Sequence, residues 1–272
     1  SLQNLKIKNL VKLRRRRQRD RQKLMLIDGA RALRMALDNH FDIDAIYFSE
    51  TQRAEHAELL HQATLKNIAL QPVSAAVFSK IGYGDTPDSI LGLAEQPTLS
   101  LDNLPRSQNP LYIIAEGLEK PGNLGAILRS ADAAGVDGLI LCNPQTDIYN
   151  PNVIRASRGT FFSVPMAQAA VEETLHWLRE ETLQIVAAAP ESDLRYTQVD
   201  MRPPTAIILG AEHAGLSDAW RKRTLVTIPM RGQADSLNVA QSASILMFEA
   251  LRQREEATTN SGTRLYDAQR AK

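Results

Sequence analysis

The segment "IPMRGQADSLNVAQSASILMFEALRQR", residues 228–254, places a polar loop between two apolar elements. It begins as the end of a strand and finishes as a strongly apolar helix. The loop between them carries five hydrogen-bonding side chains, Gln233, Asp235, Ser236, Asn238 and Gln241. One residue of this kind is enough to cap the N-terminus of a helix. The surplus therefore indicates a ligand site built from amides, hydroxyls and exposed backbone groups.

Upstream of this stretch, from Leu111 onward, short apolar segments alternate with helical ones. The expected strands are "LYIIAEGL", "DGLILC", "LQIVAAAP", "TAIILGAE" and "TLVTIPM", and the helices include "GNLGAILRSADAAG" and "VEETLHWLREE". This alternation predicts an α/β fold, with a parallel sheet and helices on both faces. In such sheets ligands bind at the carboxyl ends of the strands. The loops "EGLEKPGN", "GAEHAGL" and "RGQADSLN" are therefore expected to lie together.

Residues 24–95 predict a smaller α/β unit, in which Asp28 is a candidate cap for the helix that follows it. Residues 96–109 have the composition of a linker. We therefore expect one domain over 1–105 and a second over 106–272, with a polar C-terminal tail from about 255.

The composition, 43% hydrophobic and 23% charged, is that of a globular protein. No apolar run approaches the roughly 20 residues that a membrane helix needs, and no signal-peptide segment is present. The single Cys142 cannot form an intrachain disulfide, which fits a cytoplasmic protein. His56 and His61 do not share a helical face, so we expect them to be exposed to solvent and predict no metal site.

Basic residues gather near the N-terminus. From Lys12 to Lys23, both included, the chain has eight basic residues and one acid, although its whole net charge is only +1. A solvated helix face or a disordered arm is one interpretation, but a run this dense favours contact with RNA phosphates. The candidate contacts in the run are Arg14, Arg15, Arg16 and Arg17.

A second basic segment, "NPNVIRASRGTFF", adds Arg155 and Arg158 as candidate phosphate contacts. Phe161 and Phe162 behind them are predicted to be core residues, because "SVPM" then follows as a strand. Several enzyme classes are disfavoured. The chain lacks the complete glycine-rich dinucleotide fingerprint, the phosphate-binding loop of nucleotidases and the nucleophile elbow of serine hydrolases.

Three segments resemble, in order and spacing, the three motifs of the SpoU (TrmH) family of RNA ribose 2′-O-methyltransferases, which belongs to the SPOUT class. The first, "EKPGNLGAILRSADAAG", holds Asn123 and Arg129, and the second, "ILGAEHAGL", holds Glu212. The third is the opening stretch, with Ser236 and Asn238. The resemblance covers roughly residues 111–254.

One residue departs from the family's pattern, because many relatives carry Ser where this chain has Ala240. The N-terminal "LIDGARALRMAL" and its basic lead-in also resemble the substrate-binding domain of this family, which has a ribosomal protein L30-like fold. The resemblance thus implies such a domain ahead of a trefoil-knotted methyltransferase domain.

The resemblance further implies that the backbone around the knot cradles S-adenosylmethionine. The cofactor-binding residues would be Gly210, Ile228, Met230, Leu237 and Val239. Gly210 would allow close approach because it has no Cβ. The family's obligate homodimer fits the last helix, which is apolar nearly all round because Ile245 and Phe248 fall outside its main stripe.

The resemblance places Arg129 in activation of the ribose 2′-hydroxyl. A guanidinium with a pKa above about 12 is a poor base, so we interpret its role as holding the target phosphate and stabilising the developing oxyanion. Asn123 and Asn238 would orient Arg129 and the ribose, and Ser236 would fix the loop or the RNA. Glu212 would hold an arginine of the site in place.

The chain is therefore expected to be an S-adenosylmethionine-dependent methyltransferase of structured RNA, with ribosomal RNA favoured over transfer RNA. The alternatives are a transfer RNA 2′-O-methyltransferase and a non-catalytic RNA-binding scaffold. The expected partners are structured RNA and a second copy of the chain, with no metal and no membrane.

Overall fold

The computed structural model describes residues 3–83 and 89–270, with side chains described as far as residue 257. It divides into two compact units, each made of three segments. The first unit comprises Ser1–Thr98, Lys120–Arg129 and Thr146–Ser163. The second unit comprises Leu99–Glu119, Ser130–Gln145 and Val164–Lys272. Two segments that follow strands of the second unit are therefore part of the first.

The first unit contains a four-stranded sheet in the order β1-β4-β2-β3. Its strands are β1 (Leu24–Asp28), β2 (Ala45–Ser49), β3 (Ala69–Val73) and β4 (Ile90–Glu95). The central β4 pairs antiparallel with β1 and β2, while β2 and β3 are parallel. The predicted α/β character of this region is confirmed.

Helices cover this sheet on two sides. They are α1 (Leu5–Leu13), α2 (Arg16–Gln22), α3 (Ala30–Asp38), η1 (Glu50–Gln52), α4 (Ala57–Leu65) and α5 (Ala75–Ile81). Leu10 of α1 and Phe78 of α5 share a buried cluster with Leu26, Tyr47 and Leu91 of the strands. The basic lead-in is therefore helical, and its first helix is part of the core of this unit.

The segment over residues 146–163 contributes α7 (Pro151–Ala156) and η3 (Thr160–Phe162), and α7 packs against β1. Phe161 is buried, as predicted, and Phe162 stacks edge-on against Phe41 with ring centroids 4.9 Å apart. The rings of Phe161 and Phe162 also contact each other, with centroids 5.1 Å apart.

Two local predictions for this unit are wrong. The N-cap residue of α3 is Gly29 and not Asp28; Asp28 is buried, with Oδ2 3.9 Å from Nε of Arg155. His56 is not exposed, because its Nε2 lies 2.6 Å from the Ser89 hydroxyl inside the unit. The environments of Asp28 and His56 thus depend on Arg155 and Ser89, which are distant in sequence, so local periodicity could not predict them.

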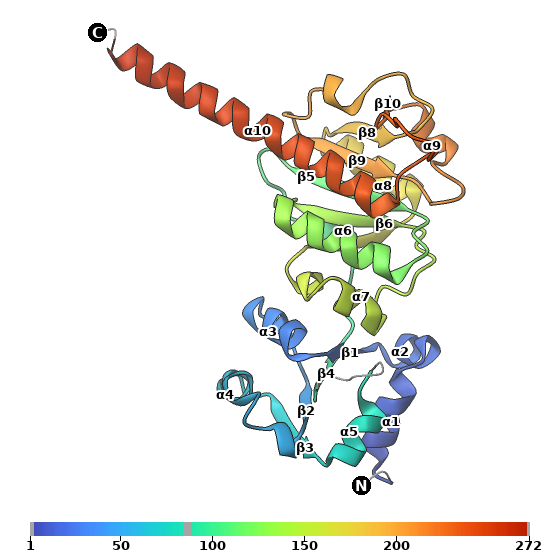
Figure 1. Ribbon diagram of the computed structural model, residues 1–272, viewed down its shortest axis with the longest axis vertical. Helices are drawn as coiled ribbons and strands as arrows, with labels where there is room; N and C mark the ends of the chain where they lie inside the picture. The colour runs from blue at the N-terminus through green and yellow to red at the C-terminus, as the bar shows by residue number, and fades with distance from the viewer. Residues whose placement is uncertain (1–2, 84–88, 271–272) are drawn as a thin grey trace. The chain divides into compact units, whose positions relative to one another are not determined.

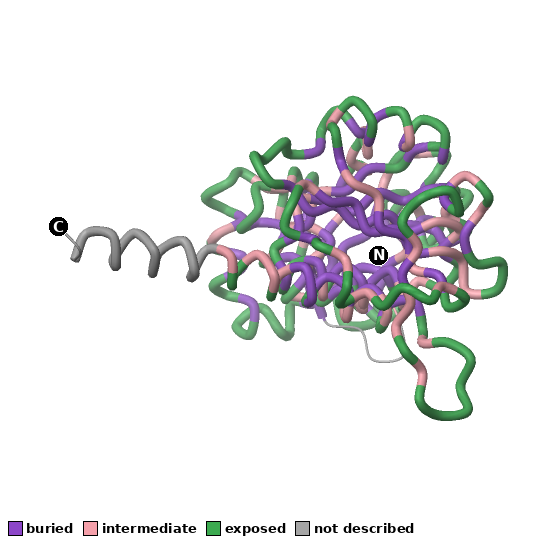
Figure 2. Tube along the Cα trace, turned by 90° about the horizontal axis from the view of Figure 1, so that it is seen from above, coloured by how far each residue is buried: buried purple, intermediate pink, exposed green. Residues whose placement is uncertain are grey.

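The second unit contains a six-stranded sheet in the order β10-β8-β9-β5-β6-β7, and all of its pairings are parallel. The strands are β5 (Leu111–Glu116), β6 (Gly138–Cys142), β7 (Met166–Ala169), β8 (Gln184–Ala188), β9 (Thr205–Leu209) and β10 (Thr224–Val226). The predicted parallel sheet is confirmed. The central strands β5, β6 and β9 are buried almost throughout, as such a sheet requires. Figure 2 colours the buried parts of the chain purple and the exposed parts green.

Helices lie on both faces of this sheet (Figure 1). They include α6 (Pro121–Ala134), α8 (Val171–Glu180), α9 (Asp218–Arg221) and α10 (Val239–Arg270), and two short turns are η2 (Leu101–Asn103) and η4 (Tyr196–Gln198). On one face Trp177 of α8 and Trp220 of α9 join a cluster with Tyr112 and Ile208. On the other, α10 packs against β9 and is joined to the end of α6 through the Ser130 and Ser244 hydroxyls, 2.7 Å apart.

The polar tail predicted from about residue 255 continues α10, which runs to Arg270. No helix within the described residues is long and apolar enough to span a bilayer.

Candidate active site

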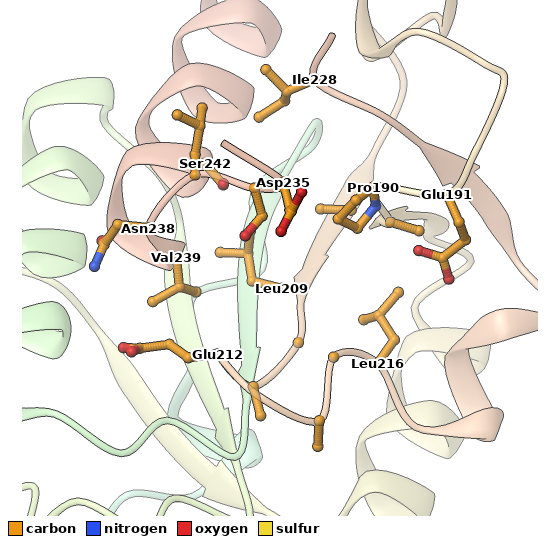
Figure 3. A pocket seen from close by; sticks show the side chains of 18 of the residues that line it. Pro190, Glu191, Leu209, Glu212, Leu216, Ile228, Asp235, Asn238, Val239 and Ser242 are labelled. Carbon is orange, nitrogen blue, oxygen red and sulfur yellow. The ribbon is translucent and has the colours of Figure 1, made fainter. Parts of the chain in front are cut away.

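A cavity of about 500 Å³ opens in the second unit, beside the carboxyl ends of β8, β9 and β10. Its walls come from the loop after β8, the loop after β9, the residues after β10 and the first turn of α10 (Figure 3). The predicted gathering of polar loops at this edge is therefore confirmed for "GAEHAGL" and "RGQADSLN".

The third predicted loop, after β5, lies against the loop after β9. The Glu116 carboxylate, at the end of β5, accepts a hydrogen bond of 3.0 Å from the backbone N–H of Ser217. A Cβ added to Gly117 would lie 3.0 Å from the Cβ of Ala211. The loops after these neighbouring strands therefore support each other.

The polar stretch before α10 has a partial explanation as a helix cap. The Asn238 side-chain oxygen accepts a hydrogen bond of 2.9 Å from the backbone N–H of Ala240. Capping therefore accounts for Asn238, while Asp235 and Ser236 line the cavity. Figure 3 shows the Asp235 carboxylate among the cavity side chains, between Pro190 and Leu209.

Gly210 is needed at its position by the loop that it begins. A Cβ there would lie 2.4 Å from the carbonyl carbon of Gly215 and 2.5 Å from the nitrogen of Leu216. The same loop is closed by two hydrogen bonds between Ala211 and Gly215, of 3.0 and 2.9 Å. The missing side chain thus lets the loop after β9 fold back tightly on the strand end, which shapes the cavity wall.

The cavity combines apolar walls with an excess of acidic groups. Leu209, Leu216, Ile228, Leu237 and Val239 are among its apolar lining residues. Its lining carboxylates are Glu191, Glu212 and Asp235, and Arg221 supplies the lining guanidinium. A flat apolar ligand that carries positive charge would match this lining.

Arg221 is held at the cavity by an ion pair with Glu191. The backbone N–H of Glu191 itself and the Arg221 guanidinium hold the pKa of the Glu191 carboxyl below its usual range. Both side chains are about half exposed, at 53% for Glu191 and 43% for Arg221. The pair therefore adds little to stability but keeps a negative and a positive group at the mouth of the cavity.

The structure gathers the predicted cofactor-binding residues in one place. Gly210, Ile228, Met230, Leu237 and Val239 all line the cavity. Three predicted catalytic residues, Glu212, Ser236 and Asn238, line it as well. Figure 3 shows the Glu212 and Asn238 side chains on one side of the cavity, with Glu191 on the opposite side.

The other two predicted catalytic residues, Asn123 and Arg129, are not among the cavity residues. Both lie on α6, in the part of that helix that belongs to the first unit. The first unit also holds the predicted RNA contacts of the basic run and of α7.

The two arginines after β6 are exposed but differ in their contacts. The Arg155 guanidinium lies near Asp28 and donates a hydrogen bond of 3.3 Å to the carbonyl of Tyr83. The backbone carbonyl of Arg158 accepts one of 3.2 Å from Arg31. Arg155 therefore helps to attach the 146–163 segment to the N-terminal sheet.

Sequence reasoning missed the loop after β8, which adds Pro190 and Glu191 to the cavity, and it did not assign Ser242 or Arg221. The loop after β8 could have been predicted to line the site, because β8 was predicted as a strand and parallel strands end at the same edge of a sheet. That prediction also needed the order of the strands, and β8 lies directly beside β9 only in the folded sheet.

The cavity fits the cofactor implied by the family resemblance. S-adenosylmethionine has an apolar, flat adenine ring and a sulfonium group with a permanent positive charge. The apolar side chains and the carboxylates that line the cavity suit these two features in turn.

Comparisons with known proteins agree with this geometry. Residues 110–248 match the family model of the SpoU rRNA methylase family, and residues 4–92 match an MRM3-like substrate binding domain. The chain is 31% identical to a 23S rRNA (uridine(2479)-2′-O)-methyltransferase of Streptomyces viridochromogenes, over 90% of this chain and 88% of that one. It is 40% identical to a 23S rRNA (guanosine-2′-O-)-methyltransferase of Shewanella oneidensis, over 72% of this chain and 83% of that one.

A solved structure is also similar. The AdoMet-bound rRNA methyltransferase from Sinorhizobium meliloti superimposes with a TM-score of 0.84 at 30% identity, and the match covers 93% of this chain and 96% of that one. The fold and the site thus define an RNA 2′-O-ribose methyltransferase that uses S-adenosylmethionine. Within that class, the chain belongs to the SpoU rRNA methylase family.

Proposed function

We propose that the chain methylates a ribose 2′-hydroxyl of 23S ribosomal RNA, with S-adenosylmethionine bound in the cavity of the second unit. The observation that carries the proposal is the cavity lining, in which apolar side chains and an excess of carboxylates are built on the strand ends of the parallel sheet. The names of the relatives from Streptomyces viridochromogenes and Shewanella oneidensis support the choice of RNA. Those two relatives differ in the base, so the proposal concerns the ribose alone.

Main-chain groups around Gly210, Ile228 and Leu237 would hold the adenosyl group, with Met230 and Val239 beside them. Backbone N–H and C=O groups can read the edge of an adenine ring while apolar side chains contact its faces. When bound, this cofactor supplies a methyl group activated by its sulfonium sulfur.

Arg129 is proposed to act on the RNA. The ribose 2′-hydroxyl would release its proton to water while its oxygen bonds to the methyl carbon and the bond from that carbon to sulfur breaks, so negative charge would develop on the oxygen. The Arg129 guanidinium would hold the neighbouring phosphate and stabilise that charge, because a group that stays protonated is a poor base and a good electrostatic partner. Asn123 and Asn238 would orient the arginine and the ribose, and Ser236 and Glu212 would support them.

The N-terminal unit would bind the RNA. Arg14, Arg15, Arg16 and Arg17 are all exposed, as are Arg155 and Arg158. Exposed cations attract phosphates at long range and position the substrate without reading its sequence.

A homodimer is proposed through α10. Phe248 is a large apolar residue on this helix and is 45% exposed in the single chain. We expect Phe248→Glu to produce monomers or insoluble chain, because a charge would enter an apolar interface. Light scattering on the unmodified protein checks this, and a monomer at micromolar concentration would contradict it.

The function is tested by supplying the purified chain with radiolabelled S-adenosylmethionine and either 23S rRNA or transfer RNA transcripts. We expect label in the 23S rRNA, at a position that becomes resistant to alkaline hydrolysis because its 2′-oxygen is blocked. Label in transfer RNA alone would overturn the choice of substrate, and alkali-sensitive label would overturn the ribose as the target.

A further inference from the structure

The basic run from Lys12 to Lys23 is not a uniform surface, because several of its arginines are engaged within the first unit. The Arg14 guanidinium lies over the Tyr83 ring, 5.6 Å from its centroid. Nε of Arg16 lies 3.5 Å from Oδ2 of Asp20, one helical turn further on. These contacts direct both groups toward neighbouring parts of the same unit.

Arg19 is the clearest case, because it is only 2% exposed. Its guanidinium donates a hydrogen bond of 2.6 Å to the Leu13 carbonyl and forms an ion pair with the buried carboxylate of Asp147. Arg19 therefore joins the end of α1 to the segment that precedes α7. It is a structural arginine inside a run whose pattern predicts RNA binding.

Three other cations of the run surround a hollow instead. Lys12 at the end of α1, Arg15 at the start of α2, and Arg21 one turn beyond Gln18 line a depression of about 360 Å³, with Val11 and Gln18 between them. Gln18 and Arg21 are three residues apart and share one side of α2, whereas Arg16 and Asp20 share another. We name this depression, lined by Val11, Lys12, Arg15, Gln18 and Arg21, the α1–α2 hollow.

The charge of the α1–α2 hollow is uncompensated. Lys12, Arg15 and Arg21 are exposed, and in the described part of the chain no carboxylate lies within ion-pair distance of any of them. Like charges gathered around one depression repel each other, and a ligand with negative charge relieves that repulsion. A concave site with donors on several sides also suits the tetrahedral oxygens of a phosphate better than a flat surface does.

We infer that the α1–α2 hollow docks the phosphate backbone of the RNA, and that the buried Arg19 holds the helical corner on which the hollow lies. This inference rests on the proposed function, because the match to a substrate binding domain over residues 4–92 is what favours RNA over other polyanions. It differs from a general attraction by the basic run, since it assigns the contacts to Lys12, Arg15 and Arg21.

The test compares two variants that remove the same amount of charge. The hollow variant carries Lys12→Gln, Arg15→Gln and Arg21→Gln, and the control variant carries Arg14→Gln, Arg16→Gln and Arg17→Gln. Binding of 23S rRNA transcript is measured by filter retention at several KCl concentrations for both variants and the unmodified protein. Circular dichroism and thermal unfolding confirm that each variant is folded.

We expect the hollow variant to reduce the slope of log affinity against log salt by roughly 0.7 to 0.9 for each phosphate that is no longer bound. The control variant should reduce it clearly less. Equal reductions in the two variants would overturn the inference, because the run would then act through diffuse charge. A larger reduction in the control variant would also overturn it.

Two further measurements distinguish a failure of the inference from a failure of the proposed function, and RNA from lipid as the ligand. If the unmodified protein transfers no methyl group to 23S rRNA but binds it with a slope that only the hollow variant reduces, the proposed function fails and the hollow stands. Binding is also measured to vesicles of phosphatidylglycerol. If the hollow variant no longer binds vesicles and keeps its RNA slope, the hollow is a lipid site and the inference is wrong.

Discussion

The cavity of the second unit and the α1–α2 hollow of the first differ in charge and in surroundings. The cavity is walled by apolar side chains and holds three carboxylates against one guanidinium. The hollow is lined by three exposed cations, with Val11 and Gln18 between them. The first suits a small cationic ligand whose binding depends on burial, and the second suits a polyanion whose binding depends on salt. On the proposed function, the chain would bind its two substrates at sites of opposite charge.

The two regions also differ in how their side chains are held. The cavity residues follow strands whose pairing and burial fix the strand ends. The hollow lies on two short helices, and the buried pair of Arg19 and Asp147 joins α2 to a segment 128 residues away. The Arg19–Asp147 pair therefore adds a buried polar contact to the apolar packing that holds α1 in the first unit.

We expect the largest effect from a substitution that breaks the buried Arg19–Asp147 pair. Arg19→Ala leaves the Asp147 carboxylate buried without its cation, which should lower the free energy of unfolding by about 3–5 kcal/mol. Chemical denaturation of the variant measures this decrease. Arg17→Ala, which removes an exposed arginine of the same helix, is the matched control and should change stability by no more than about 0.5 kcal/mol. Equal, small effects in the two variants would show that the buried pair is not needed.

The next effect concerns Arg129, which belongs to the same unit as the basic residues. Arg129→Ala should reduce methyl transfer by roughly 10²–10³-fold, the range found when one donor to a developing oxyanion is removed. Its affinity for S-adenosylmethionine should match that of the unmodified protein. Arg129→Lys should restore little, because a point charge does not reproduce the guanidinium fork.

Single-turnover assays and calorimetry measure these two quantities for Arg129. Arg179→Ala, on the exposed side of α8, serves as the control. Weaker cofactor binding in Arg129→Ala, or near-normal turnover in Arg129→Lys, would contradict an action on the RNA.

We expect a smaller effect, on the affinity for S-adenosylmethionine, when a carboxylate of the cavity loses its charge. Asp235→Asn removes one of its carboxylates and should weaken S-adenosylmethionine binding by about fivefold, which corresponds to roughly 1 kcal/mol for one charge pair in a wet site. Binding of S-adenosylhomocysteine should change less, because its sulfur is uncharged. Calorimetry with both ligands tests this, with Asp193→Asn as a control outside the cavity. An equal decrease for both ligands would mean that Asp235 shapes the loop and does not act through its charge.

Sequence patterns predicted most of the second unit. Its strands are nearly continuous apolar runs separated by helical periods, and this pattern is local. All five predicted cofactor-binding residues line one cavity, because strand ends of a parallel sheet share an edge. The trefoil knot and the homodimer stay predictions.

What the patterns missed depends on partners far along the chain. Ser89 makes His56 a buried residue, Arg155 makes Asp28 an ion-pair partner, and Asp147 makes Arg19 structural. A charge run identifies a basic region but does not say which cations face solvent, because that depends on helix faces and on these distant partners. The need for glycine at position 210 likewise comes from the fold-back of its own loop.

A pair of salt titrations on the unmodified protein tests directly whether the two substrates bind at sites of opposite charge. Affinity for S-adenosylmethionine is measured by calorimetry, and affinity for 23S rRNA by filter retention, over the same series of KCl concentrations. We predict a cofactor affinity that changes little with salt and an RNA affinity that falls steeply, with a slope of roughly 0.7 to 0.9 per bound phosphate. Absence of any cofactor heat, or cofactor and RNA affinities that fall in parallel, would contradict the division of the two substrates between an acidic cavity and a basic hollow.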